Sequence, residues 1–395
     1  MSSNLNQGVS LEFVPGNGVP QDTVPPRVWL VMGYRAGENS QILALGEALG
    51  WPFEIKKIRH RRWEFVTSLA CGTGLKGIVK GKSSPLEPPW PDLVISAGLL
   101  NEPVCRWIRK QANGKVRLVH IGRPWTKPQH FDVVVTTPQY RLPEHPKVLQ
   151  NTMPLHRVTQ DRLAAAAADW SSRFIHLPRP WIAVVMGGNS GPYTLGPKAG
   201  RRLGREAGLL AARAGGSLLV TTSSRTPPSA LVALQSTLEV PAYVYPWAPD
   251  ATENPYYAYL ALADSLVVTG DSMAMLAEAC ATCKPVSIFD LGDGPDSMKL
   301  LSRGRRSRLS GVNWRRAGLD FRVGGFLYWQ MMRLGLRRLT RDLGSIHQRL
   351  IASGRAVWLG EEFSTGKDML PPDDLERAVG RVKTLFGQSS VKVDS

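Results

Sequence analysis

The chain has 395 residues, which is too long for one ordinary core and indicates about two domains. Hydrophobic residues make up 43% and charged residues 21%, a globular composition that excludes a wholly disordered chain, and four cysteines are too few for a disulfide framework. The net charge is +17, which favours polyanions, phosphorylated small molecules or an anionic membrane surface as partners.

Residues 1–26 are polar and contain Pro and Gly, without the basic start and apolar centre of a secretory signal. We expect a disordered leader here. The chain also has no run approaching the roughly 20 apolar residues that a spanning helix needs. We therefore expect a cytoplasmic protein, either free or peripheral on the inner face of the membrane.

From residue 27 onward, short apolar runs alternate with helical stretches, which is typical of parallel α/β domains. The runs lack clean polar–apolar alternation, as expected of strands covered on both faces. In the first half we predict strands at Val28–Met32, Glu54–Ile58, Asp92–Ser96, Arg117–Ile121 and Asp132–Thr136, and helices at Asn39–Leu49, Glu102–Gln111 and Gln160–Ser172.

Two prolines within His176–Pro180 interrupt regular structure and mark a domain junction. In the series that follows we predict strands at Trp181–Met186, Ser217–Thr222, Ala242–Tyr245, Ser265–Thr269 and Val286–Phe289, and helices at Pro197–Ala214, Pro228–Thr237, Pro255–Ala263 and Ser272–Ala281. The predicted fold is α/β, with two doubly wound parallel-sheet domains, 27–175 and 181–298, facing across a cleft. Ligands of such domains bind at the carboxyl ends of the strands.

A basic helical segment, 299–395, follows and ends in a return helix. Residues 299–349 contain thirteen basic and two acidic residues, so they carry 11 of the 17 net positive charges. The remainder is only mildly basic, and no nucleic-acid-binding module is recognisable, so we expect no nucleic-acid partner.

Within this segment, apolar residues recur at spacings of three and four from Trp329 to Leu350, which predicts one helix with an apolar stripe. Arg333, Arg337 and Arg341 form a row beside the stripe. Such a helix can rest on anionic lipid. The alternative is a helix packed on its own domain with a solvated charged face.

The loop after the first strand begins at Gly33 and contains Gly37 and Glu38. The glycines permit a tight turn ahead of a helix N-terminus that can hold an anion. The loop lacks the GxGxxG pattern, and no acidic residue ends the next strand, so a nicotinamide dinucleotide enzyme is disfavoured.

A second loop comprises Gly187, Gly188, Asn189, Ser190 and Gly191. It offers amide groups and small donors suited to a phosphate or diphosphate. It lacks the Lys of a Walker loop, so we expect no nucleotide hydrolysis. The alternative is an ordinary structural turn at a strand end.

A third loop contains Ser223, Ser224 and Arg225. Hydroxyls beside an Arg can bind phosphate oxygens. The same residues can also serve as a helix cap before Pro227 and Pro228, and the two roles are compatible.

The fourth loop joins the strand ending at Thr269 to a helix that begins near Ser272. We expect Asp271 and the amides of Ser272 and Met273 to lie at a diphosphate, because helix N-termini bind anions. Glu278, on the same helix, can accept hydrogen bonds from a ribose diol.

The run Glu278-Ala279 followed by Lys284-Pro285-Val286 resembles the donor-site helix of GT-B glycosyltransferases, in which a Glu grips the nucleotide ribose. Cys283 stands where that family commonly has Gly. This difference predicts a turn that does not need a positive φ.

More specifically, the chain resembles the mitochondrial-fission, elongated-mitochondria family, whose bacterial members are GT-B-like. The resemblance covers about Val28 to Leu291 and departs at Ser40 and at Gly122-Arg123. It rests on Gly37–Gln41, Pro91–Gly98, Leu155–Thr159, Gly187-Gly188, Leu219–Pro227, Glu253–Tyr256 and the Glu278 helix. It implies a GT-B-like fold and a nucleotide-sugar site, to which we add Asn254. Plant members are described as organelle-division factors.

Other sites are disfavoured. The pair Cys280 and Cys283 stands alone, so we predict no metal site. Ser190 has no evident base, which argues against a serine hydrolase. His120 ends a strand near the supposed cleft and is either a base or, more commonly for such a residue, a structural imidazole.

Together these features predict a metal-independent GT-B-type glycosyltransferase. It would move a sugar from a nucleotide-diphosphate donor, its substrate rather than a cofactor, to an acceptor such as a lipid-linked or envelope glycan. Glu38 is the first choice for the general base and His120 the second. The alternative is a non-catalytic, membrane-associated adaptor of the mitochondrial-fission family.

Overall fold

The computed structural model describes residues 24–61, 73–293, 297–299, 320–335, 339–363 and 373–387. Most of the predicted leader, up to residue 23, lies outside the described residues. So do residues 300–319 and 336–338 of the basic segment and residues 388–395 at the end of the chain.

Six parallel strands form the first sheet, in the order β2-β1-β3-β4-β5-β6. Every side chain of β1 and β3 is buried, which explains their continuous apolar sequences. Backbone pairing aligns Val28 with Phe53 on one side and with Leu93 on the other. The strands are β1 (Val28–Met32), β2 (Phe53–Lys57), β3 (Leu93–Ala97), β4 (Arg117–Ile121), β5 (Val133–Thr136) and β6 (Val148–Gln150).

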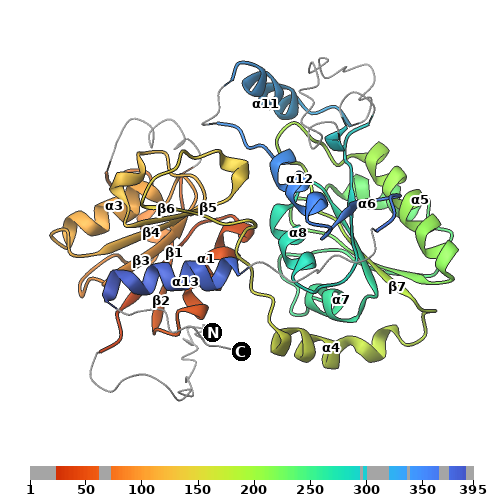
Figure 1. Ribbon diagram of the computed structural model, residues 1–395, viewed down its shortest axis with the longest axis horizontal. Helices are drawn as coiled ribbons and strands as arrows, with labels where there is room; N and C mark the ends of the chain where they lie inside the picture. Colours follow the sequence, from red (N-terminus) through yellow and green to blue (C-terminus); the bar gives the residue numbers. More distant parts are fainter. Residues whose placement is uncertain are drawn as a thin grey trace, which may run out of the picture.

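Helices α1 (Ala36–Ala48) and α13 (Asp374–Lys383) lie side by side on this sheet, although they come from opposite ends of the chain (Figure 1). Ala378 and Val382 of α13 are fully buried in the same core as α1. Helix α3 (Glu102–Gln111) contributes to a second core that also contains residues of β1, β3 and β4. The C-terminal return helix therefore belongs to the first domain.

The second sheet also has six parallel strands, in the order β12-β11-β10-β7-β8-β9. They are β7 (Trp181–Val185), β8 (Ser217–Thr221), β9 (Ala242–Tyr245), β10 (Ser265–Thr269), β11 (Val286–Phe289) and β12 (Val357–Trp358). The helices around it are α4 (Gln160–Phe174), α5 (Pro197–Ala214), α6 (Pro228–Gln235), α7 (Tyr256–Leu262), α8 (Met273–Cys280) and α12 (Gly344–Ala352). The predicted pair of doubly wound parallel-sheet domains is confirmed.

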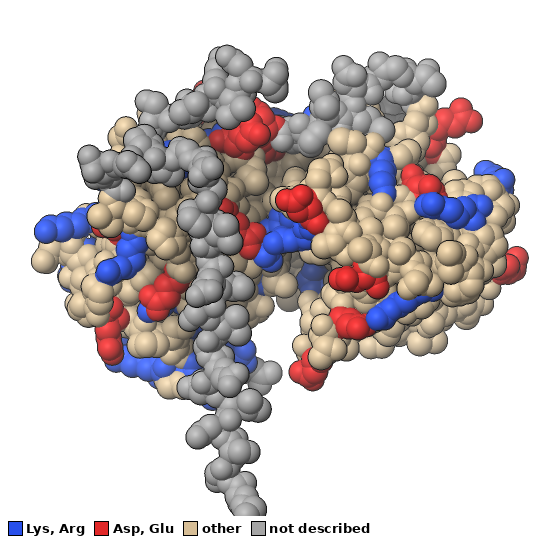
Figure 2. All heavy atoms as spheres, turned by 90° about the horizontal axis from the view of Figure 1, so that it is seen from below, with Lys and Arg blue, Asp and Glu red and all other residues tan. Residues whose placement is uncertain are grey.

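Helix α4 packs on the second domain and not on the first, where we predicted it. We included it in the first domain, yet Leu163, Trp170 and Phe174 are buried in the core of the second. The connection between the domains therefore runs through the residues before α4. Figure 2 shows a hollow between the two lobes, with basic side chains at its floor.

The predicted single helix from Trp329 to Leu350 is wrong. Gly335 adopts a φ of +72° just after α11 (Val323–Arg333), which ends the helix, and a new helix, α12, begins at Gly344. Ile346 and Leu350 of α12 are buried in the second core. The predicted arginine row is not a helix face, because Arg341 lies beyond the break; Arg337 falls outside the described residues. No helix among the described ranges is both long and apolar enough to cross a bilayer.

Candidate functional site

Three of the predicted loops meet at the carboxyl edge of the second sheet. Strand β7 pairs with β8 on one side and with β10 on the other, so the loops that follow these strands are neighbours. They carry Gly187–Gly191, Ser223–Arg225 and Asp271–Met273. The topology therefore brings together most of the predicted donor-site residues.

Asp271 lies at the centre of this loop cluster, with a fully buried side chain. Its Oδ2 accepts hydrogen bonds from the Gly188 amide at 2.9 Å and from Arg225 Nη2 at 3.1 Å, and its Oδ1 accepts from Thr269 Oγ1 at 2.7 Å. Burial raises the pKa of Asp271, while the Arg225 charge opposes that shift. Asp271 therefore organises the loops from inside and does not face a ligand.

The amides of Gly187 and Gly188 are both used within the protein. Gly187 donates to Thr269 Oγ1 at 2.7 Å and Gly188 to Asp271. A Cβ at position 187 would overlap the Asp271 carboxylate, and one at position 188 would overlap the Arg225 backbone. The expectation of exposed amides here is wrong, because these glycines serve close packing between loops.

Asn189 and Ser190 are likewise held from within. Asn189 Oδ1 accepts from the Leu195 amide at 3.0 Å, and Ser190 Oγ accepts from Arg341 Nη2 at 3.1 Å. The sequence reasoning missed Arg341 as a residue of this loop cluster, because it placed Arg341 on a surface helix. The signal for Arg341 in the sequence was its place in the basic segment, which indicated that it could bind an anion.

The third loop presents Ser224 and Arg225 to solvent. Ser223 Oγ instead donates to Gly187 O at 2.6 Å. Ser224 is exposed, and the Arg225 side chain is 44% exposed although its guanidinium is held by Asp271 and by Asn189 O. Arg225 is thus a fixed positive charge at the rim of the loop cluster.

Helix α8 directs its N-terminus toward the first domain. The first hydrogen bond of the helix runs from the Leu276 amide to Ser272 O, at 3.0 Å. The amides of Met273, Ala274 and Met275 are therefore the open end of the helix. The Ser272 amide is 3.4 Å from Thr269 O, and the Ser272 and Met273 side chains are buried. A Cβ on Gly37, at the start of α1, would lie 4.0 Å from the Ala274 Cβ.

Glu278 is a buried residue of α8 and is 7% exposed. Tyr256 OH donates to Glu278 Oε2 at 2.5 Å. Burial raises the pKa of Glu278 to about 7, against the hydrogen bond from Tyr256 and the charges of Arg157 and Arg162. Arg157 in turn binds Glu47 of α1, with Nε 3.0 Å from Oε2. The carboxylate of Glu278 is therefore close enough to feel the charges of Arg157, in the interdomain connection, and of Arg162, on α4.

Asn254 is exposed and lies just before α7. Its Oδ1 accepts from the Tyr256 amide at 2.9 Å, so it stabilises the start of α7, the helix that carries Tyr256. Asn254 therefore acts on the Glu278 region only through α7.

The prediction that the turn at Cys283, after α8, does not need a positive φ is wrong. Cys283 has a φ of +56°, so the turn does adopt the left-handed conformation that glycine favours. The next residue, Lys284, donates from Nζ to Leu260 O at 3.0 Å and to Ala263 O at 2.7 Å, at the end of α7. This turn therefore ties α8 to α7.

The two predicted bases differ in access. Glu38 pairs with Arg35 at 3.2 Å, lies against the Gly98 turn and has a side chain that is 25% exposed. His120 is fully buried, with Nδ1 3.4 Å from Ser96 Oγ, and burial lowers its pKa to about 4. The structure contradicts a catalytic role for His120, because a neutral imidazole inside the sheet cannot reach a substrate.

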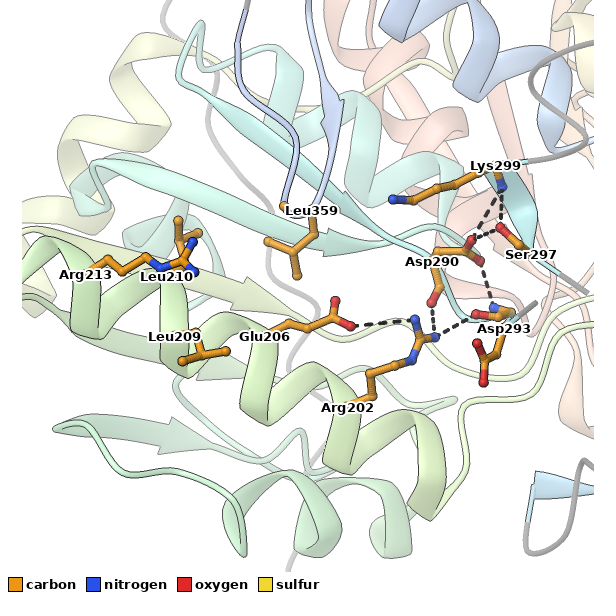
Figure 3. Close-up of a pocket in the computed structure, with 12 residues that line it drawn as sticks. Arg202, Glu206, Leu209, Leu210, Arg213, Asp290, Asp293, Ser297, Lys299 and Leu359 are labelled. Carbon is orange, nitrogen blue, oxygen red and sulfur yellow. Dashed lines mark hydrogen bonds and ion pairs between the residues drawn. The ribbon is translucent and has the colours of Figure 1, made fainter.

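A pocket of about 360 Å³ lies between α5 and the residues that follow β11 (Figure 3). Its polar groups are engaged with one another. Arg202 lies 3.8 Å from Glu206, and Asp290 accepts from the amides of Gly292 at 2.8 Å and Met298 at 2.9 Å. None of the predicted site residues lines it. No group of three or more His, Cys, Asp or Glu suited to a metal occurs among the described residues.

A family model described as Mitochondrial fission ELM1 matches residues 36–305. The chain belongs to this family. The predicted family resemblance is confirmed, and the matched range contains the whole loop cluster and the Glu278 region. Among the α-helices of the described residues, α11, α12 and α13 lie beyond it.

Relatives of this ELM1-family chain include "Mitochondrial fission protein ELM1" of Arabidopsis thaliana, 29% identical over 54% of this chain and 55% of that protein. A second is "Uncharacterized protein RP120" of Rickettsia prowazekii, 22% identical over 50% of this chain and 64% of that protein. The chain thus matches 55% and 64% of the lengths of these relatives, less than two thirds of each.

Solved structures with a similar backbone include S. aureus MnaA with UDP, which is 12% identical to this chain. The TM-score is 0.44, and the match covers 91% of this chain and 97% of that one. Another is a glycosyltransferase from Rickettsia africae, at 13% identity, a TM-score of 0.43 and coverage of 93% and 99%.

Proposed function

We propose that this ELM1-family protein is a GT-B-type glycosyltransferase that uses a nucleotide-diphosphate sugar. The observation that carries the proposal is the placement of α8. Its open amide end, at Met273–Met275, faces the start of α1, and Glu278 on the same helix interacts with the charge of Arg157 in the interdomain connection. One helix thus offers an anion-binding terminus and a carboxylate acceptor, which are the two groups that a nucleoside diphosphate needs.

The diphosphate would lie at the α8 N-terminus beside Arg225 and Ser224. These groups carry positive charge or donors, and they are the parts of the loop cluster that face solvent. Negative charge builds on the departing diphosphate during sugar transfer, and a helix N-terminus with an Arg can neutralise it without a metal. Glu278 is buried, so it would accept from the ribose hydroxyls once the residues that cover its carboxylate move aside.

Glu38 is the proposed general base. It follows Gly37, where a Cβ would lie 4.0 Å from the Ala274 Cβ, and its side chain remains partly open to solvent. A base must reach the acceptor hydroxyl from the side opposite the donor. Glu38 satisfies this requirement by its place on the facing domain.

The acceptor is proposed to be lipid-linked, which would place the protein on an anionic membrane surface. Phe321, Val323, Leu327 and Leu334 on and beside α11 are 42%, 63%, 56% and 74% exposed. Arg333 and the other basic residues of 299–349 accompany them. Exposed apolar side chains among positive charges fit the interface of an anionic bilayer.

A non-catalytic adaptor is the second candidate. The observation that favours it is the use of the Gly187, Gly188 and Ser190 amides inside the protein, which removes three donors that a phosphate would need. In such an adaptor the α11 face would be the functional surface.

Calorimetric titration of the full chain with UDP- and GDP-sugars separates the two candidates. We expect the wild type to bind one nucleotide class, Glu278→Gln to bind it about tenfold more weakly, and Glu239→Gln to match the wild type. Glu239 is exposed and precedes β9, at the opposite edge of the sheet. Absence of binding by the wild type, or equal binding by Glu278→Gln, would favour the adaptor.

A further inference from the structure

The contact between Tyr256 and Glu278 is the shortest polar link between α7 and α8. Tyr256 OH donates to Glu278 Oε2 at 2.5 Å, while Oε1 accepts no hydrogen bond from any described residue. A carboxylate oxygen offers two lone pairs. Glu278 therefore keeps acceptor capacity on both oxygens after the tyrosine is bound.

Helix α7 holds this phenol in place from both of its ends. The Tyr256 amide donates to Asn254 Oδ1 at the start of the helix, and Lys284 donates to Leu260 O and Ala263 O at its end. The Tyr256 ring also packs edge-on against Tyr257, with centroids 5.5 Å apart. The position of the hydroxyl is thus set by the fold and not by a free side chain.

The charges around Glu278 come from three further elements. Arg157 lies in the interdomain connection and Arg162 on α4, and both favour the ionised carboxylate. Tyr257 of α7 also interacts with Glu278. Both arginines are shared with Glu47 of α1, which lies 2.5 Å from Arg157 and 3.6 Å from Arg162. The arginines are therefore paired with Glu47 and act on Glu278 through their charge. Among the described side chains, Tyr256 is the one that donates a hydrogen bond directly to Glu278.

We propose that Tyr256 is a positioning residue for nucleotide binding: it fixes the Glu278 carboxylate toward the ribose and keeps it in the acceptor form. This inference rests on the proposed function. A ribose diol donates two hydrogen bonds to a carboxylate, and a protonated carboxyl would lose acceptor capacity. Tyr256 therefore acts on the ribose through Glu278 and need not touch the sugar.

The consequence is a pH-dependent affinity. The pKa of Glu278 is about 7 in the folded protein, so the acceptor form grows as the pH rises through that value. The hydrogen bond from Tyr256 lowers the pKa of Glu278, so its removal raises that pKa. Nucleotide binding in Tyr256→Phe should then require a higher pH than in the wild type.

The test is calorimetric titration of the full chain with UDP and GDP between pH 6 and pH 9. For the nucleotide that binds, we expect the wild-type affinity to rise with a midpoint near pH 7. In Tyr256→Phe that midpoint moves upward, affinity at pH 7 falls about tenfold, and the two proteins converge at pH 9. The 2′,3′-dideoxy form of the nucleotide should bind both proteins equally, because it lacks the ribose hydroxyls.

Tyr259→Phe is the matched control. Tyr259 lies on the same helix, is fully buried, and its hydroxyl has no hydrogen-bond partner among the described residues. We expect this variant to keep the wild-type pH profile. A loss in Tyr256→Phe that is equal at every pH, or equal for the dideoxy nucleotide, would mean a merely structural role and would overturn the inference.

The outcomes also separate the two proposals. If Glu278→Gln weakens binding and Tyr256→Phe has the wild-type profile, the inference fails and the proposed function stands. If the wild type binds neither nucleotide at any pH, the proposed function fails and the inference fails with it.

Discussion

Arg341 Nη2 donates to Ser190 Oγ at 3.1 Å, across 151 positions of sequence. The same segment reaches the first domain, because the Asp342 amide donates to Gln139 O at 2.8 Å and Arg141 donates to Thr340 Oγ1 at 3.2 Å. Residues 340–342 therefore touch the Gly187–Gly191 loop and the first domain at once. This short part of the basic segment therefore belongs to the interdomain structure.

Arg341→Met should loosen this loop. Ser190 and Tyr193 exchange backbone hydrogen bonds at 3.1 Å, and the Arg341 contact holds the Ser190 side chain beside them. We expect hydrogen exchange at the Ser190 and Tyr193 amides to accelerate about tenfold, as for the loss of one hydrogen bond. Arg349→Met is the control, since Arg349 is exposed on α12. Unchanged exchange at both amides would contradict the role assigned to Arg341.

Asp271→Asn should destabilise the second domain. The substitution removes the charge that Arg225 pairs with, and it offers a carboxamide where the Gly188 amide and Thr269 hydroxyl both need an acceptor. Because Arg225 is partly exposed, we expect a loss of about 2–3 kcal/mol in the free energy of unfolding. Urea denaturation measures it. Asp250→Asn, at an exposed position, should change stability by less than about 0.5 kcal/mol; a similar loss there would refute the argument.

Cys283→Gly should stabilise the chain. Cys283 has a φ of +56°, which costs a side-chain-bearing residue about 1–2 kcal/mol, while glycine loses more backbone entropy on folding. We expect a net gain of about 0.5 kcal/mol by denaturant unfolding. Ala281→Gly in the same turn, where φ is −69°, should instead cost about 1 kcal/mol. Destabilisation by both glycines would show that the Cys283 side chain is needed.

The pattern of apolar residues along the sequence predicted the long strands and missed the short ones. The strands Val28–Met32, Arg117–Ile121, Ala242–Tyr245, Ser265–Thr269 and Val286–Phe289 have the predicted bounds. Val28–Met32 and Val286–Phe289 are fully buried, and fully buried parallel strands are continuous apolar runs that are easy to recognise. The short strands β6 and β12 were missed, since two or three residues carry no periodic signal. The apolar spacing from Trp329 onward wrongly predicted one helix. Trp329 lies on α11, whereas Leu343 and Ile346 belong to the start of α12.

The site was predictable in its location and less so in its contacts. The strand-end loops could be placed together by the rule that parallel strands share a carboxyl edge. Their internal bonding could not, because it depends on which side chain enters the space above Gly187 and Gly188. That side chain is Asp271, from 83 positions further along the chain than Gly188.

Glu278 should make stability depend on pH between about 4.5 and about 7. Its folded pKa of about 7 lies above its ordinary value of 4.5, so the folded state holds a proton that the unfolded state has released. The free energy of unfolding therefore falls as the pH rises from about 4.5 to about 7, by about 2–3 kcal/mol for this group. We expect Glu278→Gln to be more stable than the wild type at pH 8 by about that amount.

The comparison of the two proteins at pH 5 is the internal control. There the wild-type carboxyl is protonated when folded, so the advantage of Glu278→Gln should largely vanish. Urea unfolding at pH 5 and pH 8 measures both differences. An equal difference at the two values would show that Glu278 is ionised throughout and would remove the physical basis for its pH-dependent binding.

The α11 face should determine membrane binding if the basic segment serves a lipid surface. Val323 and Leu327 lie one helical turn apart and are both largely exposed. Leu327→Glu places a negative charge on this face, so we expect binding to vesicles with 30% phosphatidylserine, measured by co-sedimentation, to fall about tenfold. Leu209→Glu on α5 is the control, because Leu209 is equally exposed at 58% but lies outside the basic segment. If both variants bind like the wild type, the lipid role of α11 is wrong; if the wild type binds neutral vesicles equally well, the positive charge is not what attracts the surface.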